Sequence, residues 1–149
     1  MCTGVVRRAA HRGFTLVELI VVIVILAILS AVAIPRYIDY SARARESATR
    51  GTLGGVRAAI ANFYANSALS GTPAWPTLTN VQTVGSVMQE AIAANPYSSS
   101  TVPASIGAAT WATTPPVTTG ASVPGWNYDA TQGKFWVNTT TTGVNEHLW

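Results

Sequence analysis

A run of apolar residues near the N-terminus constrains this chain more than any other feature. From Leu19 to Ile34 the sequence reads LIVVIVILAILSAVAI, and Ser30 is the only polar residue in it. The stretch from Phe14 to Ile34 has 21 residues, which is about 31 Å in an α-helix at 1.5 Å per residue. That length matches the hydrocarbon core of a bilayer. The stretch therefore predicts a membrane-spanning helix, and Pro35 marks its end.

The formal net charge of +3 lies entirely in residues 1–13. That segment carries Arg7, Arg8 and Arg12 and no acid, and after it six basic residues balance six acidic ones. Positive residues ahead of an apolar helix predict a cytoplasmic N-terminus. Nine Lys and Arg in the whole chain are too few for a surface that follows a phosphate backbone, so we expect no nucleic-acid partner.

Residues 1–34 admit three interpretations. They form a plain single-pass anchor, or a secretory signal peptide cut at Ala31-Val32-Ala33, or a short leader that is removed ahead of an apolar helix that stays. Glu18 favours the third interpretation, because a carboxylate in an apolar segment is costly unless it is paired or lies at an interface. A signal peptide gains nothing from such a residue. A Glu18 side chain that reaches the headgroups is the simpler alternative.

The residues around Glu18 resemble a known motif. Residues 12–19, RGFTLVEL, look like the prepilin cleavage and methylation motif of type IV pilins and pseudopilins, and the resemblance extends over roughly residues 7–40. It implies that a prepilin peptidase cuts between Gly13 and Phe14 and methylates the new Phe14 amine. It also implies that Glu18 neutralises the Phe14 amine of a neighbouring subunit. Pro35 itself predicts that the helix is kinked or loosened near this residue.

The same resemblance implies a location and a set of partners. The chain would span the bacterial cytoplasmic (inner) membrane once, and would then enter a periplasmic or extracellular filament. Its partners would be copies of itself as a homo-polymer, the prepilin peptidase, an inner-membrane assembly platform, and membrane lipid before assembly.

The helix is expected to continue from about Thr15 to about Ala68, apolar in its first half and amphipathic in its second. Four apolar residues recur at spacings of three, four and three, which is typical of one helical face. They are Leu53, Val56, Ile60 and Phe63. We expect this face to pack on a C-terminal domain.

The C-terminal half predicts a small domain that contains a β-hairpin. Residues 125–138 place aromatic and β-branched runs on either side of a turn at 129–133. Residues 79–94 suggest a short second helix, and residues 98–124 a long loop with one strand near 109–113. Burial of several of the eight aromatic residues after position 70 would supply much of the core.

The expected fold is therefore α+β, with a long N-terminal helix packed on a small antiparallel β-sheet as in pilins. The expected divisions are a removed leader (1–13), a transmembrane and assembly helix (14–34), its amphipathic continuation (35–69) and a globular domain (70–149).

No pattern in the sequence predicts catalysis, so we expect no enzyme, no catalytic residue, no metal and no cofactor. H-E-x-x-H, G-x-S-x-G and paired cysteines are absent. Asp129 and Glu146 are the only acids after residue 90, which is too few for a strong calcium site. Major pseudopilins of type II secretion often carry an acidic calcium loop, and this chain departs from them. Asn138-Thr139-Thr140 could carry a sugar, although an exposed polar loop is the simpler alternative.

These features together predict a structural subunit of a type IV pilus-like filament. The alternatives are a pseudopilin of a type II secretion system, a minor subunit at a filament tip, and an anchored or secreted binding module that never polymerises. Residues 36–69 carry a formal charge of +3 and residues 70–149 a charge of −2. If subunits are staggered in a filament, the positive region of one subunit could lie next to the negative region of another. Such a contact would favour one relative orientation of the subunits more than it would raise their affinity.

Overall fold

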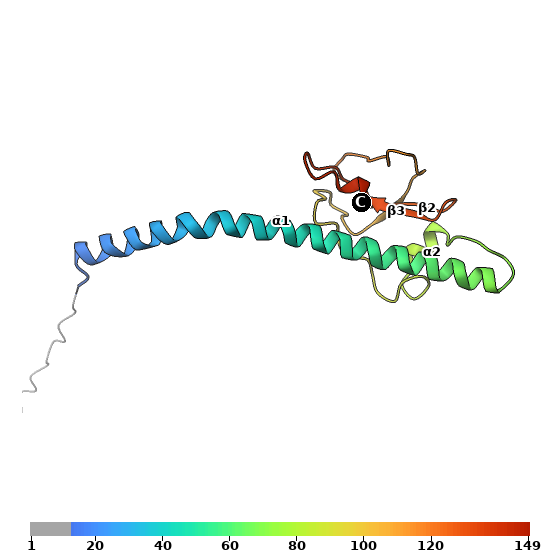
Figure 1. The fold of residues 1–149 in the computed structure, drawn as a ribbon, viewed down its shortest axis with the longest axis horizontal. Helices are drawn as coiled ribbons and strands as arrows, with labels where there is room; N and C mark the ends of the chain where they lie inside the picture. Colours follow the sequence, from blue (N-terminus) through green and yellow to red (C-terminus); the bar gives the residue numbers. More distant parts are fainter. Residues whose placement is uncertain (1–12) are drawn as a thin grey trace, which may run out of the picture. The chain divides into compact units, whose positions relative to one another are not determined.

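The computed structural model describes residues 13–149, so the basic leader before Gly13 lies outside the described residues. The chain forms two compact units, one ending at Ser41 and the other running from Ala42 to Trp149. Figure 1 shows the elements in sequence order. They are α1 (Leu16–Leu69), α2 (Leu78–Gln82), β1 (Ile106–Ala108), β2 (Trp126–Asp129), β3 (Lys134–Val137) and the 3-10 turn η1 (Glu146–Leu148).

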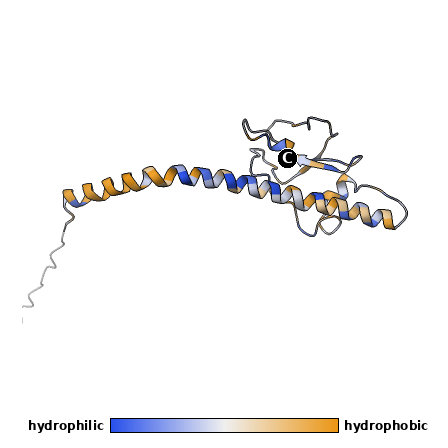
Figure 2. Ribbon diagram, in the orientation of Figure 1, coloured by the Kyte–Doolittle hydropathy of each residue, from blue (hydrophilic) through white to orange (hydrophobic). Residues whose placement is uncertain are grey.

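Helix α1 has 54 residues and confirms the predicted long helix to within one residue at each end. Its first part is apolar on every side, as the colouring of Figure 2 shows. Pro35 lies inside the helix, where it removes one backbone hydrogen bond and crowds the carbonyl four residues earlier. The kink at Pro35 stays a prediction.

The amphipathic part of α1 packs on the C-terminal domain as expected. Leu53, Val56 and Ile60 are at most 4% exposed and belong to the core cluster, whereas Phe63 is half-buried. Their spacing places them on one face of the helix. This face contacts the same cluster as the strands, so the compact unit that begins at Ala42 contains the second part of α1 as well as the sheet.

The three strands form one sheet in the order β1-β2-β3. Strands β2 and β3 are antiparallel, with Trp126 opposite Val137. Strands β1 and β2 are parallel, with Ile106 opposite Trp126. The α+β class is confirmed, and the sheet is mixed rather than purely antiparallel. A parallel pair cannot be joined by a tight hairpin, and the segment between residues 109 and 125 makes the return connection.

The predicted hairpin is confirmed, and its turn is held by one side chain. Asp129 Oδ1 accepts hydrogen bonds from the N–H of Thr131, the hydroxyl of Thr131 and the N–H of Gln132, at 2.6 to 3.3 Å. Gly133 closes the turn with φ +65°, and a Cβ there would lie 2.3 Å from the Trp75 ring. Both the backbone angle and the close ring therefore require glycine.

Two elements differ from the sequence-based expectation. The second helix covers only Leu78–Gln82, because Thr83 is extended and Gly85 adopts φ +87°. The strand expected near 109–113 lies at Ile106–Ala108 instead. It ends there because the Trp111 N–H donates to Asp129 Oδ2 at 2.8 Å rather than to a neighbouring strand.

Aromatic side chains fill the core as predicted. The four on β2 and β3 are at most 1% exposed, and they are Trp126, Tyr128, Phe135 and Trp136. The side chains of Trp75 and Trp149 pack against this cluster from outside. Burial raises the pKa of Tyr128 to about 12, and its hydroxyl donates to the Pro76 carbonyl at 2.7 Å.

Hydrogen bonding to Asp129 predicts that the stability of this domain depends on pH. Burial alone would raise the pKa of the Asp129 carboxyl, but the hydrogen bonds from Thr131, Trp111 and Gln132 outweigh it and hold the pKa below its usual value. A carboxyl with a depressed pKa stabilises the fold above its unfolded pKa of about 3.9, and this contribution is lost as the pH falls through the folded value.

We therefore expect Asp129→Asn to lower the free energy of unfolding at pH 7 by about 1–3 kcal/mol, because an amide nitrogen cannot accept the Trp111 N–H. The difference from wild type should shrink as the pH falls below about 4. Urea unfolding at several pH values measures the loss of stability at pH 7 and its change with pH. Glu90→Gln, at an exposed acid, is the control and should show no such trend; a difference for Asp129→Asn that stays constant with pH would contradict the assignment.

Candidate processing and assembly site

The N-terminus of α1 is closed by a pair of side chains that bond to each other's backbone. Thr15 precedes the first helical residue, Leu16, and its hydroxyl oxygen accepts the N–H of Glu18 at 3.2 Å. In return, Glu18 Oε2 lies 3.5 Å from both the N–H and the hydroxyl of Thr15. This is a capping box, in which residues three apart satisfy two of the N–H groups that a helix start leaves free.

The two halves of this capping box differ in strength. The contact to the Thr15 hydroxyl has an ordinary hydrogen-bond length, whereas both contacts to the Glu18 carboxylate, at 3.5 Å, are long. The carboxylate is therefore only weakly held by its own chain. It lies in the first turn of α1, at the positive end of the helix dipole. A cation from another molecule can approach it without breaking a strong internal bond.

Gly13 and Phe14 lie just ahead of this cap and make few contacts. Phe14 is 80% exposed. A Cβ added at Gly13 would meet no atom within 4 Å, and the φ of Gly13 is not positive. The fold of the described residues therefore does not require glycine at position 13.

The apolar part of α1, residues 16–34, buries none of its side chains. Exposed fractions run from 46% at Ile20 to 73% at Leu16. An apolar surface of this extent marks a region that contacts lipid or other chains. By length and composition, α1 can cross a membrane.

The structure brings Thr15 and Glu18 together, and sequence reasoning identified Glu18 but missed Thr15. The pattern Thr-x-x-Glu at the start of an apolar run would have found the capping box. Gly13, Phe14 and Glu18 lie close along the chain in the predicted order. Cleavage, methylation and pairing at these residues stay predictions.

Other polar groups of the C-terminal domain serve the fold. Asn138 is 1% exposed, and its amide donates to Thr118 Oγ1 at 2.8 Å and to the Pro124 carbonyl at 2.7 Å. Its buried side chain is therefore not accessible to a glycosylating enzyme in the folded domain. Glu146 is fully buried and accepts bonds from Thr141. Among residues 13–149, no three His, Cys, Asp or Glu side chains gather closely enough to hold a metal ion.

Arg57 also has a structural role, because it ties the helix to the end of the domain. Its Nε donates to the Phe135 carbonyl at 3.0 Å and its Nη2 to the Trp149 carbonyl at 2.6 Å. Partial burial lowers the pKa of Arg57. Arg50 lies over the Trp149 ring, 4.2 Å from its centroid, and pairs with Glu46.

Comparison with known proteins identifies the same N-terminal region. Residues 8–34 match the prokaryotic N-terminal methylation motif. The chain is 38% identical over 69 residues to the fimbrial protein EcpC of Eikenella corrodens, which is 46% of this chain and 42% of that protein. It is 42% identical over 66 residues to the type IV major pilin PilE of Neisseria gonorrhoeae, covering 44% and 36% of the two chains.

A third relative is the type IV major pilin PilA of Myxococcus xanthus, with 41% identity over 54 residues, or 36% of this chain and 24% of that one. The chain thus matches less than half the length of each of these relatives. No solved structure matches it. The matched motif and the pilin relatives support the type IV pilin family that the sequence suggested.

Proposed function

We propose that this chain, which carries the N-terminal methylation motif and is similar to type IV pilins, is a structural subunit of a type IV pilus-like filament. One observation carries the proposal, namely a helix whose apolar first part is exposed on every side and begins at a weakly held carboxylate. A membrane can cover the apolar sides, but it supplies no cation at a fixed position next to Glu18. A second copy of the chain can supply both.

Cleavage after Gly13 would create the cation. The new amine of Phe14 carries a positive charge at neutral pH, since α-amino groups have a pKa of about 7.7–8.0. In an assembled helical core the low dielectric strengthens an ion pair and makes an unpaired charge costly. A pair between Phe14 of one subunit and Glu18 of the next therefore fixes their register. The residues removed carry all of the formal net charge.

The proposal gives the precursor a definite course. The basic leader stays in the cytoplasm, and α1 holds the subunit in the cytoplasmic membrane. A prepilin peptidase removes residues 1–13 and methylates Phe14. An assembly platform in that membrane then passes subunits from lipid into the filament, where the apolar part of α1 contacts other copies of itself.

Mass spectrometry of the mature protein tests the processing step. We expect a chain that begins with N-methylated Phe14, and we expect Gly13→Leu to accumulate as uncut precursor. Because a Cβ at position 13 would meet nothing within 4 Å and the residue is exposed, this variant should fold as the wild type does. A mature chain that starts at Ile34 would instead identify a signal peptide and overturn the proposal.

Electron microscopy of material sheared from producing cells tests the filament itself. We expect long surface filaments that contain the mature chain. Filaments confined to the periplasm would identify a secretion pseudopilus, and properly processed chains without any filament would identify an anchored module.

A further inference from the structure

A groove runs along α1 where the segment 87–93 crosses it. Val56 and Ala59 of α1 line one side, and Met88 and Ile92 line the other, around a volume of about 450 Å³. Gly55 also lines the groove, and a Cβ there would meet nothing within 4 Å. The absence of a side chain at Gly55 therefore leaves this part of the helix surface open to an incoming group.

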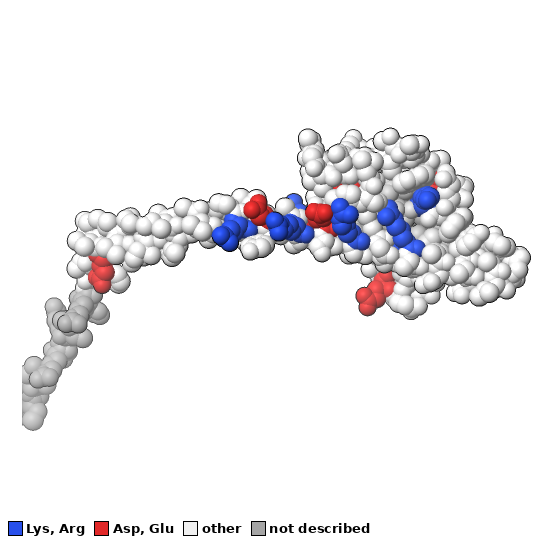
Figure 3. Space-filling view, in the orientation of Figure 1, with Lys and Arg blue, Asp and Glu red and all other residues white. Residues whose placement is uncertain are grey.

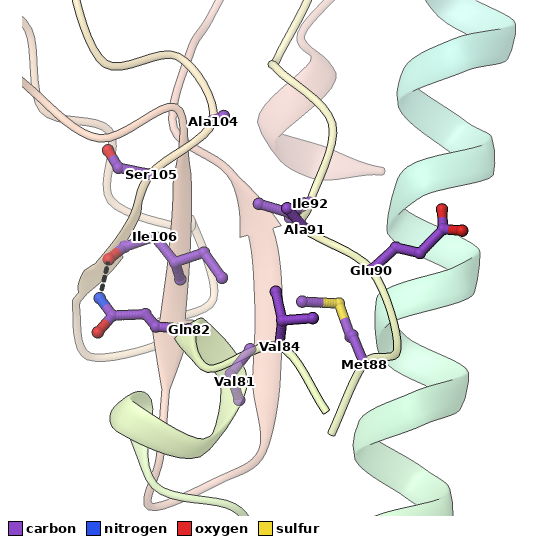
Figure 4. A pocket seen from close by; sticks show the side chains of 10 residues that line it. All are labelled: Val81, Gln82, Val84, Met88, Glu90, Ala91, Ile92, Ala104, Ser105 and Ile106. Atoms are coloured by element: carbon purple, nitrogen blue, oxygen red, sulfur yellow. Dashed lines mark hydrogen bonds between the residues drawn. The ribbon is translucent and has the colours of Figure 1, made fainter. Parts of the chain in front are cut away.

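One carboxylate stands at this groove. Glu90 lines it and is exposed. Within residues 13–149 the Glu90 carboxylate makes no hydrogen bond and no ion pair with any other side chain. Figure 4 shows its side chain pointing away from Met88 and Ile92, toward the side on which α1 lies. The groove thus combines an apolar floor with one unused negative charge, which suits an apolar or aromatic group next to a cation.

Such a combination occurs on α1 itself. Tyr40 is 65% exposed, and Arg43 follows it at the three-residue spacing that puts two side chains on one helical face. Basic side chains gather along this part of the helix in Figure 3. Arg50 is paired with Glu46, and Arg57 bonds to two carbonyl oxygens, whereas no carboxylate of the described chain lies within 4 Å of Arg43.

A chain cannot place its own Arg43 in its own groove. Both lie on the same helix, and Gly55 is 12 positions after Arg43, which corresponds to about 18 Å along the helix axis. An arginine side chain does not span that distance. If Arg43 enters this groove, it therefore comes from a second copy that is displaced along the helix axis, which is how subunits of a helical filament are related.

We propose that this groove receives Tyr40 and Arg43 of a neighbouring copy, and that Arg43 pairs there with Glu90. The inference rests on the filament function proposed above and names a contact between its subunits. Tyrosine and arginine are among the residue types enriched at the positions that contribute most to binding at protein interfaces. The exposed ion pair between Arg43 and Glu90 adds little affinity, but it disfavours binding of a neighbouring subunit in a register that does not form the pair.

A charge exchange in the full-length chain tests the contact. In producing cells, Glu90→Arg should lower the amount of sheared filament about tenfold, because it sets two cations against each other and a tenfold change corresponds to about 1.4 kcal/mol. The amount of processed subunit in the membrane should not change. Adding Arg43→Glu to Glu90→Arg should restore filaments. Arg45→Glu is the matched control, since it removes the same charge about 200° around the helix, and it should not restore them.

Disulfide trapping provides a second readout. The only cysteine of the chain, Cys2, lies in the leader, so mature chains carry no thiol of their own. The double variant Glu90→Cys/Arg43→Cys should give a ladder of linked subunits when sheared filaments are oxidised, and Glu90→Cys/Arg45→Cys should not.

The outcomes separate the two proposals. A wild-type chain that forms no filament overturns the proposed function and this contact together. Wild-type filaments with undiminished assembly of Glu90→Arg overturn the contact alone. Failure of Arg43→Glu to rescue, or equal rescue by Arg45→Glu, also overturns it. Rescue by Arg43→Glu together with the specific ladder supports it.

Discussion

Glu18→Gln is expected to lower the amount of filament at least about a hundredfold, while cleavage after Gly13 proceeds as in the wild type. The size of the effect follows from the environment of the pair. Removal of one partner from a buried ion pair costs about 3–5 kcal/mol, and each 1.4 kcal/mol is a factor of ten in an equilibrium. The glutamine variant leaves the Phe14 amine of the neighbouring subunit without its counter-charge in the filament core.

Glutamine is chosen because it separates charge from helix capping. A glutamine at this position of a capping box also accepts the N–H of residue 15, so Glu18→Gln keeps the local structure that the contacts to Thr15 define. Glu18→Ala loses both the charge and the cap. If pairing is the essential role, both variants should fail to assemble to the same degree.

Two controls and one measurement complete this test. Thr15→Ser keeps the hydroxyl that accepts the Glu18 N–H and should assemble normally. Thr15→Ala removes that hydroxyl but keeps the charge, and should reduce assembly only modestly. Sheared filament and processed subunit are quantified by immunoblot in the same cells. Normal filament amounts from Glu18→Gln would refute the pairing role.

Trp126→Ala is expected to lower the free energy of unfolding of the C-terminal domain by about 3–5 kcal/mol. Trp126 is 0% exposed. Its ring stacks on Phe135 with 5.6 Å between the ring centroids, and its Nε1 donates to the Ala93 carbonyl at 3.0 Å. Truncation therefore opens a large cavity and leaves a carbonyl unpaired. Since domains have only about 5–15 kcal/mol of stability in total, assembly should fall as well.

Urea unfolding of the mature chain in detergent micelles, followed by tryptophan fluorescence, measures this loss. Trp126→Phe keeps most of the ring and should cost about 1–2 kcal/mol. Leu69→Ala is the exposed control, because Leu69 is 87% exposed, and should change the value by less than about 0.5 kcal/mol. A Trp126→Ala variant within 1 kcal/mol of wild type would show that the ring is not central to the core.

The candidate site could be predicted almost completely from sequence because its parts are neighbours along the chain. Gly13, Phe14 and Glu18 lie within six residues. The helix that carries Glu18 follows from a long apolar run, and the matched motif covers the same residues. The capping role of Thr15 was also available from the spacing Thr-x-x-Glu. The groove at Glu90 could not be predicted from the sequence, because it forms only where residues 87–93 cross α1.

Features that depend on local periodicity and chain length follow from the order of the residues alone. These are the helix from Leu16 to Leu69, its buried face, and the hairpin of β2 and β3 with its turn at Asp129. Apolar spacing and turn residues specify such elements without reference to distant segments.

Three features could be read only from the folded chain: the parallel pairing of β1 with β2, the early end of α2 and the position of β1. Each depends on partners far apart in sequence. The Trp111 N–H ends a strand by donating to Asp129, and Gln82 donates to the Ile106 carbonyl, 24 residues away. Such contacts form only after the chain has folded back on itself. Closing these loops costs conformational entropy, and burial of the shared core offsets that cost.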